Sequence, residues 1–264
     1  MTTHRKSLTL IAASTAAFLA GSAFADVFDV QTANDNQAAT TLNELVHGSD
    51  QWHDLKALPG PKADSDWYRI SQRPYSSYEI VVEGLSGDVP GPGFQLARVA
   101  GDGTTVLQIA SSIGLGAAKS LRFVNDSADV VNDQFIVVRR AFCAKTCGAD
   151  DVYRIRAAET TAAISRFNNT GSQVTVLILQ NPTDEAVTGT IRLWTAQGTS
   201  AGSLPLNIPA RGSQVVSSQL VAPGLSGNVT IVHSAPYGDL VGKAVGLEPA
   251  TGFSFDTAME HRPR

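Results

Sequence analysis

The sequence predicts an all-β protein built from two β-sandwich domains in series, jelly-roll-like or immunoglobulin-like in character. Short stretches in which apolar and polar residues alternate with period two recur along the chain, and no long stretch places apolar residues at helical spacing. Clusters of Gly, Pro, Asn and Asp separate these stretches, as is typical of strands joined by tight turns. The length of 264 residues fits two domains of ordinary size better than one.

The first 25 residues have the pattern of a secretory signal peptide. A basic start at residues 4–6 precedes an apolar run over residues 8–20, and Ala23-Phe24-Ala25 supplies an A-x-A sequence before Asp26. The alternative is a membrane anchor, but the run is too short and too rich in Ala, Ser and Thr to favour a bilayer. We therefore expect export to the periplasm or the cell exterior, and a mature chain without a membrane span.

The charge balance of the mature chain disfavours nucleic acid as a partner. The full chain carries 20 Lys and Arg and 24 Asp and Glu; the expected leader holds two of the basic residues and no acid, so the mature net charge is −6. A mildly acidic chain is a poor ligand for nucleic acid or an anionic membrane. An extracellular protein or a glycan is the expected kind of partner.

The first domain is expected over residues 26–159. Alternation along Tyr78–Glu83 predicts a half-buried strand. Asp102-Gly103 supplies the left-handed turn residues of a tight hairpin. Phe135–Arg139 and Val152–Ala158 are expected to pair as the closing hairpin of this domain.

That closing hairpin would place four arginines on adjacent strands: Arg139, Arg140, Arg154 and Arg156. They could form a basic patch for an anionic glycan. Asp150, Asp151 and Glu159 lie close in sequence, so we favour a charge-balanced face in contact with solvent.

The second domain is expected over residues 160–264, after a boundary at Glu159–Thr161. Val174–Leu179 is apolar on both faces, as expected of a central strand in a packed sandwich. With a strand starting at Ile164, five further stretches complete a seven-stranded unit: Thr188–Thr195, Leu204–Ile208, Gln214–Leu220, Asn228–His233 and Leu240–Leu247. The final residues, Glu260–Arg264, read as a polar tail.

Cys143 and Cys147 are the only cysteines and lie four positions apart. In an oxidising compartment a local disulfide is the favoured interpretation. Closing so short a loop would stabilise the fold by about 2 kcal/mol. A metal site is disfavoured because no His or further Cys adjoins the pair.

Several motifs together resemble the bacterial pre-peptidase C-terminal domain, a β-sandwich module appended to many secreted hydrolases. They are Asn34-Asp35-Asn36 followed by Ala38-Ala39 and Leu42, Asp64-Ser65-Asp66-Trp67-Tyr68-Arg69-Ile70, Leu96–Val99 with Asp102-Gly103, and Phe135–Arg139 with Val152–Ile155. The resemblance spans residues 31–158 and implies a non-catalytic accessory module that sometimes holds calcium near the first two motifs. Residues 31–33 depart from the family, which usually has acids there. The second domain resembles unnamed β-sandwich modules of exported bacterial proteins.

A calcium site is one interpretation of three acidic residues in these motifs. Asp64 and Asp66 lie two apart, so both project from one face of a strand. With Asp35 brought near by the fold, they would supply three oxygen ligands. The alternative, which we favour, is a solvated turn and strand start in which Asp bonds local backbone N–H groups. No other cofactor is expected.

Trp67 and Trp194 each share a strand face with an arginine, Arg69 and Arg192 respectively. Either indole could stack on a sugar or a partner protein. The alternatives are packing between the domains or under the neighbouring arginine. We favour packing, because Trp is highly buried on average.

No catalytic motif is present in the sequence. Four histidines follow the leader: His47, His53, His233 and His261. They form no H-E-x-x-H sequence and no i, i+4 pair, and both G-L-S-G stretches, at 84–87 and 224–227, miss the G-x-S-x-G spacing. We therefore predict a non-enzymatic binding or structural protein of the periplasm or cell exterior. The alternatives are an accessory protein acting in trans with a secreted hydrolase, and an enzyme of unrecognised type with a site between the domains.

Overall fold

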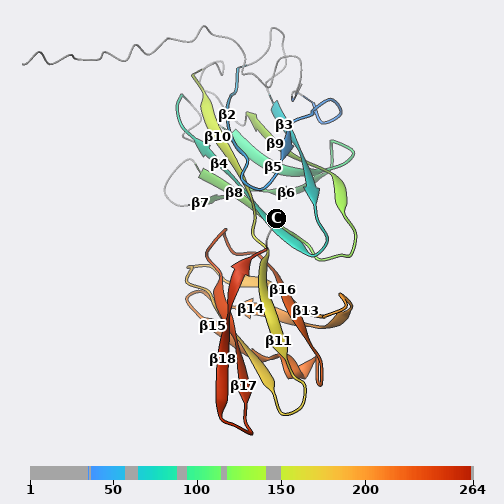
Figure 1. Cartoon of the computed structure of the whole chain (residues 1–264). Helices are drawn as coiled ribbons and strands as arrows, with labels where there is room; N and C mark the ends of the chain where they lie inside the picture. Colours follow the sequence, from blue (N-terminus) through green and yellow to red (C-terminus); the bar gives the residue numbers. More distant parts are fainter. Residues whose placement is uncertain are drawn as a thin grey trace, which may run out of the picture.

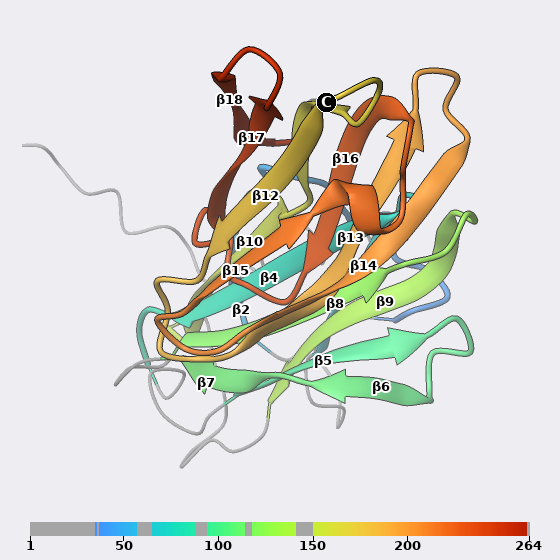
Figure 2. The same ribbon diagram turned by 90° about the horizontal axis from the view of Figure 1, so that it is seen from below.

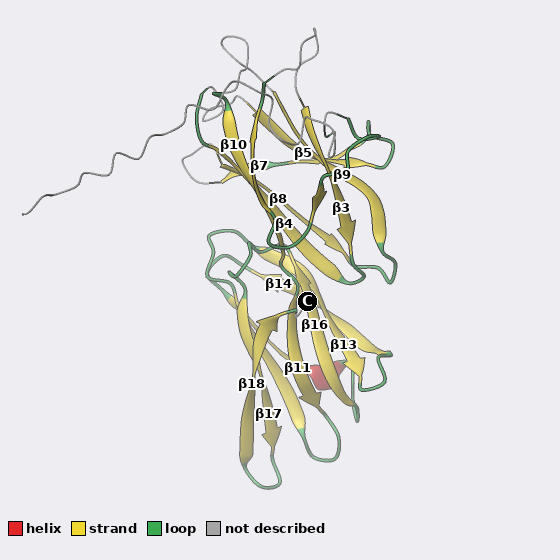
Figure 3. Cartoon of the chain, turned by 45° about the horizontal axis from the view of Figure 1, so that its top comes forward, coloured by secondary structure: helices red, strands yellow, loops and turns green. Residues whose placement is uncertain are grey.

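The structure of the protein, a computed structural model, describes residues 35, 37–56, 65–87, 94–113, 118–140 and 150–262. The expected leader, Asp64 and the Cys143–Cys147 pair lie outside the described residues and stay predictions. Within the described residues almost every element is a strand, which confirms the all-β fold class (Figure 3). The one helical segment among them is the 3₁₀ turn Ser218–Leu220.

The first domain has two five-stranded sheets (Figure 1). One sheet has the order β1-β3-β9-β5-β6, in which β1 runs parallel to β3 and the other pairs run antiparallel. The second sheet has the order β2-β10-β4-β8-β7 and is antiparallel throughout. The strands are β1 (Glu44–Leu45), β2 (Asp50–Asp54), β3 (Ser65–Gln72), β4 (Ser76–Gly84), β5 (Phe94–Ala100), β6 (Val106–Ile109), β7 (Ser111–Ile113), β8 (Ala118–Asn125), β9 (Val131–Arg140) and β10 (Val152–Glu159).

Alternating apolar residues place the hydrophobic core of this domain between its two sheets. In β3, Tyr68 and Ile70 are buried, while Trp67 is half-buried and Arg69 is exposed. Burying one such large apolar side chain stabilises the fold by about 1.5–3 kcal/mol, so the pattern decides which face of the strand points inward. Further core residues include Leu45, Leu55, Ile80, Val82, Phe94, Leu96, Leu121, Ile136, Tyr153 and Ile155.

The prediction that Phe135–Arg139 and Val152–Ala158 pair as a closing hairpin is wrong. β9 lies between β3 and β5 in one sheet, whereas β10 lies between β2 and β4 in the other. Ile136, Val137 and Val138 of β9 are all fully buried, because apolar side chains cover both faces of this central strand. Arg139 and Arg154 therefore lie in different sheets, and the four arginines form no single patch.

The second domain is one eight-stranded sheet, of order β14-β13-β16-β11-β18-β17-β12-β15, that folds over to enclose its own core. Gln214 of β15 bridges the two edge strands, because it accepts from the Asn207 N–H and donates to the Pro205 carbonyl, both at 2.9 Å. Figure 2 views the molecule from this end, where the strands wrap around a common interior. They are β11 (Ala162–Asn168), β12 (Val174–Gln180), β13 (Val187–Thr195), β14 (Ser200–Ile208), β15 (Ser213–Ser217), β16 (Ser226–His233), β17 (Val241–Glu248) and β18 (Phe253–His261).

Two details of the second domain correct the sequence prediction. The prediction of a polar tail over Glu260–Arg264 is wrong for the described residues, which reach Arg262. Residues up to His261 form β18, which pairs with β17 and β11. Phe253, Phe255 and Met259 alternate with polar residues along β18, but its side chains are mostly exposed. Backbone pairing and the contact of Met259 with the core hold the strand. The expected strand Gln214–Leu220 ends early at Ser217, whose side chain accepts from the Gln219 N–H and caps the 3₁₀ turn.

β10 ends at Glu159 and β11 begins at Ala162, so these two strands flank the predicted domain boundary. Glu159 accepts hydrogen bonds from Arg73 Nε at 3.1 Å and from Arg262 Nε at 2.9 Å. Arg262 also donates to the Tyr75 carbonyl at 2.7 Å. The residue that follows β18 therefore ties the C-terminal strand to the first domain, at the junction seen in Figure 1.

Further contacts make this junction a bonded interface. The Tyr237 N–H donates to Glu79 Oε2 at 2.8 Å, and Arg122 donates to the Ser234 carbonyl at 3.1 Å. These bonds join the outer face of the β4–β8 pair to the loop that follows β16. No helix within the described residues has the length and apolar character needed to cross a membrane.

Candidate metal centre

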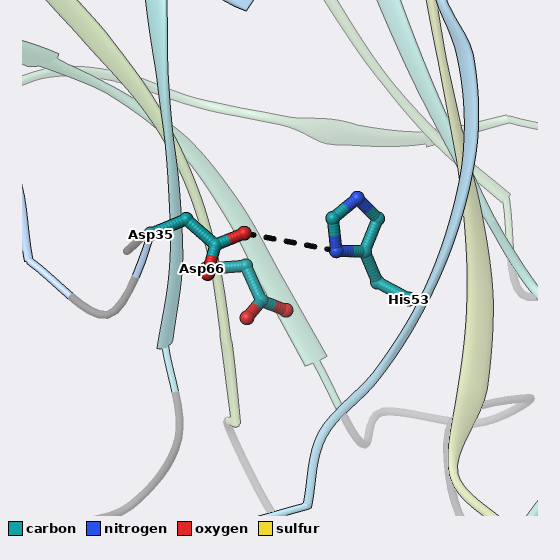
Figure 4. A group of neighbouring side chains, drawn as sticks. All are labelled: Asp35, His53 and Asp66. Atoms are coloured by element: carbon teal, nitrogen blue, oxygen red, sulfur yellow. Dashed lines mark ion pairs between the residues drawn. The ribbon is translucent and has the colours of Figure 1, made fainter. Parts of the chain in front are cut away.

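Asp35, His53 and Asp66 come together inside the first domain (Figure 4). One potential ligand atom from each side chain lies within 4.8 Å of the other two. The three residues are 0%, 1% and 0% exposed, respectively, so the cluster is closed to solvent. The calcium interpretation places Asp35 near Asp66, and the structure brings the two together. The solvated strand start that the sequence favoured is wrong for Asp66, which is fully buried, and Asp64 lies outside the described residues.

Backbone pairing explains how these residues meet across the sandwich. Asp66 points inward from β3, and the carbonyl of Asp35 accepts from the Trp67 N–H at 2.7 Å, which holds Asp35 beside that strand. A hydrogen bond from Thr41 Oγ1 to the Trp67 carbonyl, at 2.6 Å, fixes the same segment a few residues later. His53 comes from β2 in the opposite sheet, so the cluster links both sheets.

The hydrogen bonds of His53 orient its ring. Its Nε2 lies 3.0 Å from Gln51 Oε1, and the Gln51 amide nitrogen donates to Asn43 Oδ1 at 3.0 Å. Gln51 Oε1 is thus the acceptor, and His53 Nε2 carries the proton. In the neutral ring Nδ1 then presents its lone pair toward Asp35 Oδ2, 3.8 Å away. Metal-binding histidines commonly have this arrangement, with the second ring nitrogen donating to a carbonyl oxygen.

Two buried tyrosines orient the carboxylate of Asp66. The Tyr153 hydroxyl donates to Asp66 Oδ2, and the Tyr68 and Tyr153 hydroxyl oxygens lie 2.7 Å apart. Since Tyr153 gives its proton to Asp66, Tyr68 donates to Tyr153. Burial, followed by the nearby charge of Asp66, raises the pKa of Tyr153 well above its ordinary value, so its hydroxyl stays protonated. The rings of both tyrosines also contact the His53 imidazole, at centroid distances of 5.2 and 5.4 Å.

The donor set fits a transition-metal ion better than the calcium ion that the family resemblance implies. Calcium takes six to eight oxygen ligands at about 2.3–2.6 Å, and an imidazole nitrogen is foreign to such a set. Two carboxylates and one imidazole match zinc or a similar divalent ion, with bonds of about 2.0–2.2 Å. The separation of 3.8 Å between His53 Nδ1 and Asp35 Oδ2 is just under two such bonds. A divalent ion would also offset the two buried carboxylate charges.

Sequence reasoning did not single out His53 as a candidate ligand. A single histidine in the stretch Asp50–Asp54 has no second ligand at metal-site spacing, because its partners come from other segments. The available signal was strand alternation, which places His53 and Gln51 on one face and Asp50 and Trp52 on the other.

Trp67 and Trp194, for which the sequence favoured packing over stacking on a ligand, are both half-buried and pack against other side chains. Trp67 makes an edge-to-face contact with Phe135 at 6.1 Å, beside the small cluster formed by Ala97, Val99 and Val137. Trp194 contacts Tyr75 of the first domain, with ring centroids 4.9 Å apart, and its Nε1 donates to Thr230 at 3.1 Å. Trp194 thus packs between the domains, one of the alternatives that the sequence left open.

Comparison with known proteins identifies no family. No family model matches the chain, and no curated protein matches it. Among solved structures, a calcium-binding mutant of Bacteroides uniformis β-glucuronidase 2 is 14% identical, with a TM-score of 0.19, over 78% of this chain and 27% of that one. A glycosyl hydrolase family 2 member from Bacteroides cellulosilyticus is 10% identical, with a TM-score of 0.21, over 78% and 31%.

A protein from Parabacteroides distasonis, assigned to the secreted class, is 8% identical, with a TM-score of 0.24, over 81% of this chain and 89% of that one. The chain spans about a third or less of the length of the two glycosidases. All three TM-scores are too low to establish a common fold, so function is argued from the residues of the site. The likeness to the pre-peptidase C-terminal domain stays a prediction.

Proposed function

We propose that the protein is an exported, non-catalytic binding or structural protein whose first sandwich, of the pre-peptidase C-terminal type, is cross-linked by a divalent metal ion. Asp35, His53 and Asp66 would hold the ion. The burial of this cluster carries the proposal: at 0–1% exposure the three side chains admit no substrate. A structural metal site is closed in this way, whereas a catalytic site keeps a position open to water or substrate.

The junction between the domains supports the same proposal. A groove there contains His47 and Glu79, the kind of histidine and carboxylate that an enzyme between the domains would need. Both side chains already have structural partners. His47 Nδ1 accepts from the Glu159 N–H at 2.9 Å, and Glu79 accepts from Ser120 Oγ at 2.9 Å and from the Tyr237 N–H at 2.8 Å. Groups engaged in this way hold the fold together and are poorly placed to move protons on a substrate.

Metal analysis tests the proposal. The purified protein should contain about one zinc or similar divalent ion per chain, and EDTA should lower the thermal unfolding midpoint. A ligand that binds only the folded state, at a free concentration a few tens of times its Kd, stabilises it by about 2 kcal/mol. Adding back zinc should restore the midpoint more fully than adding back calcium.

The Asp66→Asn variant tests whether EDTA lowers the unfolding midpoint by removing an ion from this cluster and not by acting elsewhere on the protein. It should bind less than a tenth of the metal and show no shift with EDTA. Asp102→Asn is the matched control, because the Asp102 carboxylate lies in an exposed turn where it bonds Thr104 and Thr105. Its metal content should equal that of the wild type. Wild-type protein that holds no metal, with an unfolding midpoint indifferent to EDTA and zinc, would refute the metal cross-link.

A further inference from the structure

A groove of about 460 Å³ runs along the outer face of the sheet that contains β2, β10 and β4. Val81 and Ala158 contribute small apolar surfaces to it, and Asp50, Glu83 and Arg156 contribute polar groups. Pro236 and Tyr237, in the loop after β16, close the groove at the domain junction. This face points away from the core that holds Asp35, His53 and Asp66.

Exposed aromatic rings lie at the two ends of this face. Trp52 is 59% exposed, and it follows Asp50 by two positions, so both side chains project from the same face of β2. Tyr237 is 44% exposed and contacts His47 and His261. An indole and a phenol each combine a flat apolar face with a polar edge, so both rings can stack on a ligand and hydrogen-bond it at the same time.

The polar groups between these rings are already paired with one another. Register places Arg154 opposite Trp52 and between Trp52 and Glu83, and places Arg156 opposite Asp50. Arg154 Nε donates to Asp50 Oδ1 at 2.7 Å, and Arg156 Nη2 donates to Glu83 Oε1 at 2.5 Å. The guanidinium of Arg154 also lies 5.9 Å from the centre of the Trp52 ring. The face is therefore close to neutral, and its donors and acceptors are held in fixed positions.

We infer that this face binds a neutral oligosaccharide. Sugar hydroxyls both donate and accept hydrogen bonds, so they can use the acceptor lone pairs of the carboxylates and the remaining N–H groups of the arginines without breaking the ion pairs. The apolar C–H face of a sugar ring can cover Trp52. Glu83 and Glu79 both line the groove and lie four residues apart on β4, so at about 3.3 Å per strand residue this face is about 13 Å long, enough for a short oligosaccharide.

Charge distinguishes this ligand from an anionic one. An anion would have to compete with Asp50 for Arg154 or with Glu83 for Arg156, and it would meet carboxylates on the same face. Both pairs are partly exposed, so exchanging a carboxylate partner for a ligand anion would contribute little. Fixed, mutually paired groups also lose little side-chain entropy when a ligand binds.

This inference rests on the proposed function, since it names the ligand class of a non-catalytic binding protein. Titration calorimetry of the intact mature protein with cellopentaose, mannopentaose, xylopentaose and chitopentaose should reveal binding to at least one of them. Trp52→Ala should weaken that binding at least tenfold, and Trp52→Phe less. Phe253→Ala is the matched control, because Phe253 is an aromatic residue 75% exposed on β18 of the second domain, and its loss should leave the affinity unchanged.

Each arm of the experiment has a separate meaning. Binding that Trp52→Ala abolishes, with an unaltered unfolding midpoint, supports the inference. Absence of binding to all four sugars, or equal binding by wild type and Trp52→Ala, overturns it and leaves the metal proposal untouched. If a sulfated oligosaccharide binds in a salt-sensitive way and none of the neutral sugars binds, the inference is also overturned, because the groove would then be an anion site. Chromatography of the sugar after incubation tests the proposed function separately, since cleavage would show an enzyme while binding persisted.

Discussion

Glu159→Gln should lower the free energy of unfolding by about 2–3 kcal/mol. Glu159 is 8% exposed. Its carboxylate accepts hydrogen bonds from Arg73 of the first domain and from Arg262, the residue after β18. Glutamine keeps the size of the side chain but removes the charge, so two guanidinium groups would face a neutral amide. Removing one partner of a fully buried pair costs about 3–5 kcal/mol. We expect the smaller loss of about 2–3 kcal/mol here because the Arg73 side chain is 43% exposed and water screens its charge.

Urea denaturation of wild type and variant measures this change. Asp184→Asn is the matched control, because the Asp184 and Arg211 side chains form a pair at 2.6 Å in which both are 76% exposed. An exposed pair contributes about 0–1 kcal/mol. Equal losses in Glu159→Gln and Asp184→Asn would show that the junction pair contributes no more than a surface pair.

Acid should destabilise the protein through His233, a histidine 1% exposed at the end of β16. Burial, aided by the nearby His261, lowers its pKa from 6.5 to about 4. Its Nδ1 accepts from the Ala235 N–H at 3.2 Å, which requires that nitrogen to be unprotonated. The folded state therefore holds His233 neutral at a pH where an unfolded chain protonates it.

The sign of the pH effect follows from this difference. Above about pH 6.5 the histidine is neutral in both states and its full contribution to stability is present. As the pH falls toward about 4, the unfolded state takes up the proton first, and about 3 kcal/mol of stability is lost. Below that range both states are protonated and the loss from this group stops.

Urea denaturation at pH 7, 6, 5 and 4 should show a shallower decline for His233→Gln than for wild type. Glutamine can still accept from the Ala235 N–H but does not titrate. His261→Gln should give a decline between these two, because it removes an exposed histidine of β18 that helps to lower the pKa of His233 but leaves His233 in place to titrate. Parallel curves for wild type and His233→Gln would rule out His233 as the source of acid sensitivity.

The secondary structure and the domain boundary could be predicted because they depend on local patterns. Period-two alternation placed Tyr68 and Ile70 inside and Arg69 outside, as β3 shows. The change near Glu159 marked the end of the first sandwich. β18 escaped prediction because most of its side chains are exposed, including the apolar Phe253 and Phe255.

The partners of each strand were decided by the tertiary structure. β9 and β10 follow one another in the chain, yet each lies in a different sheet, because β9 has apolar side chains to bury on both faces and needs a central position. A period of two shows which side chains share a face but carries no information on which strand lies next to it.

For the candidate sites too, one part could be predicted from the sequence and the other was decided by the tertiary structure. The sequence by itself determined that Asp66 and Tyr68 share one face of a strand, and it offered Asp35 as their neighbour through a family resemblance, although it favoured a solvated position for these carboxylates. Only the fold brought His53 across from the opposite sheet and set Trp52 beside Arg154. Contacts between sheets form when distant segments bury apolar surface together, and the spacing of residues along one segment does not record them.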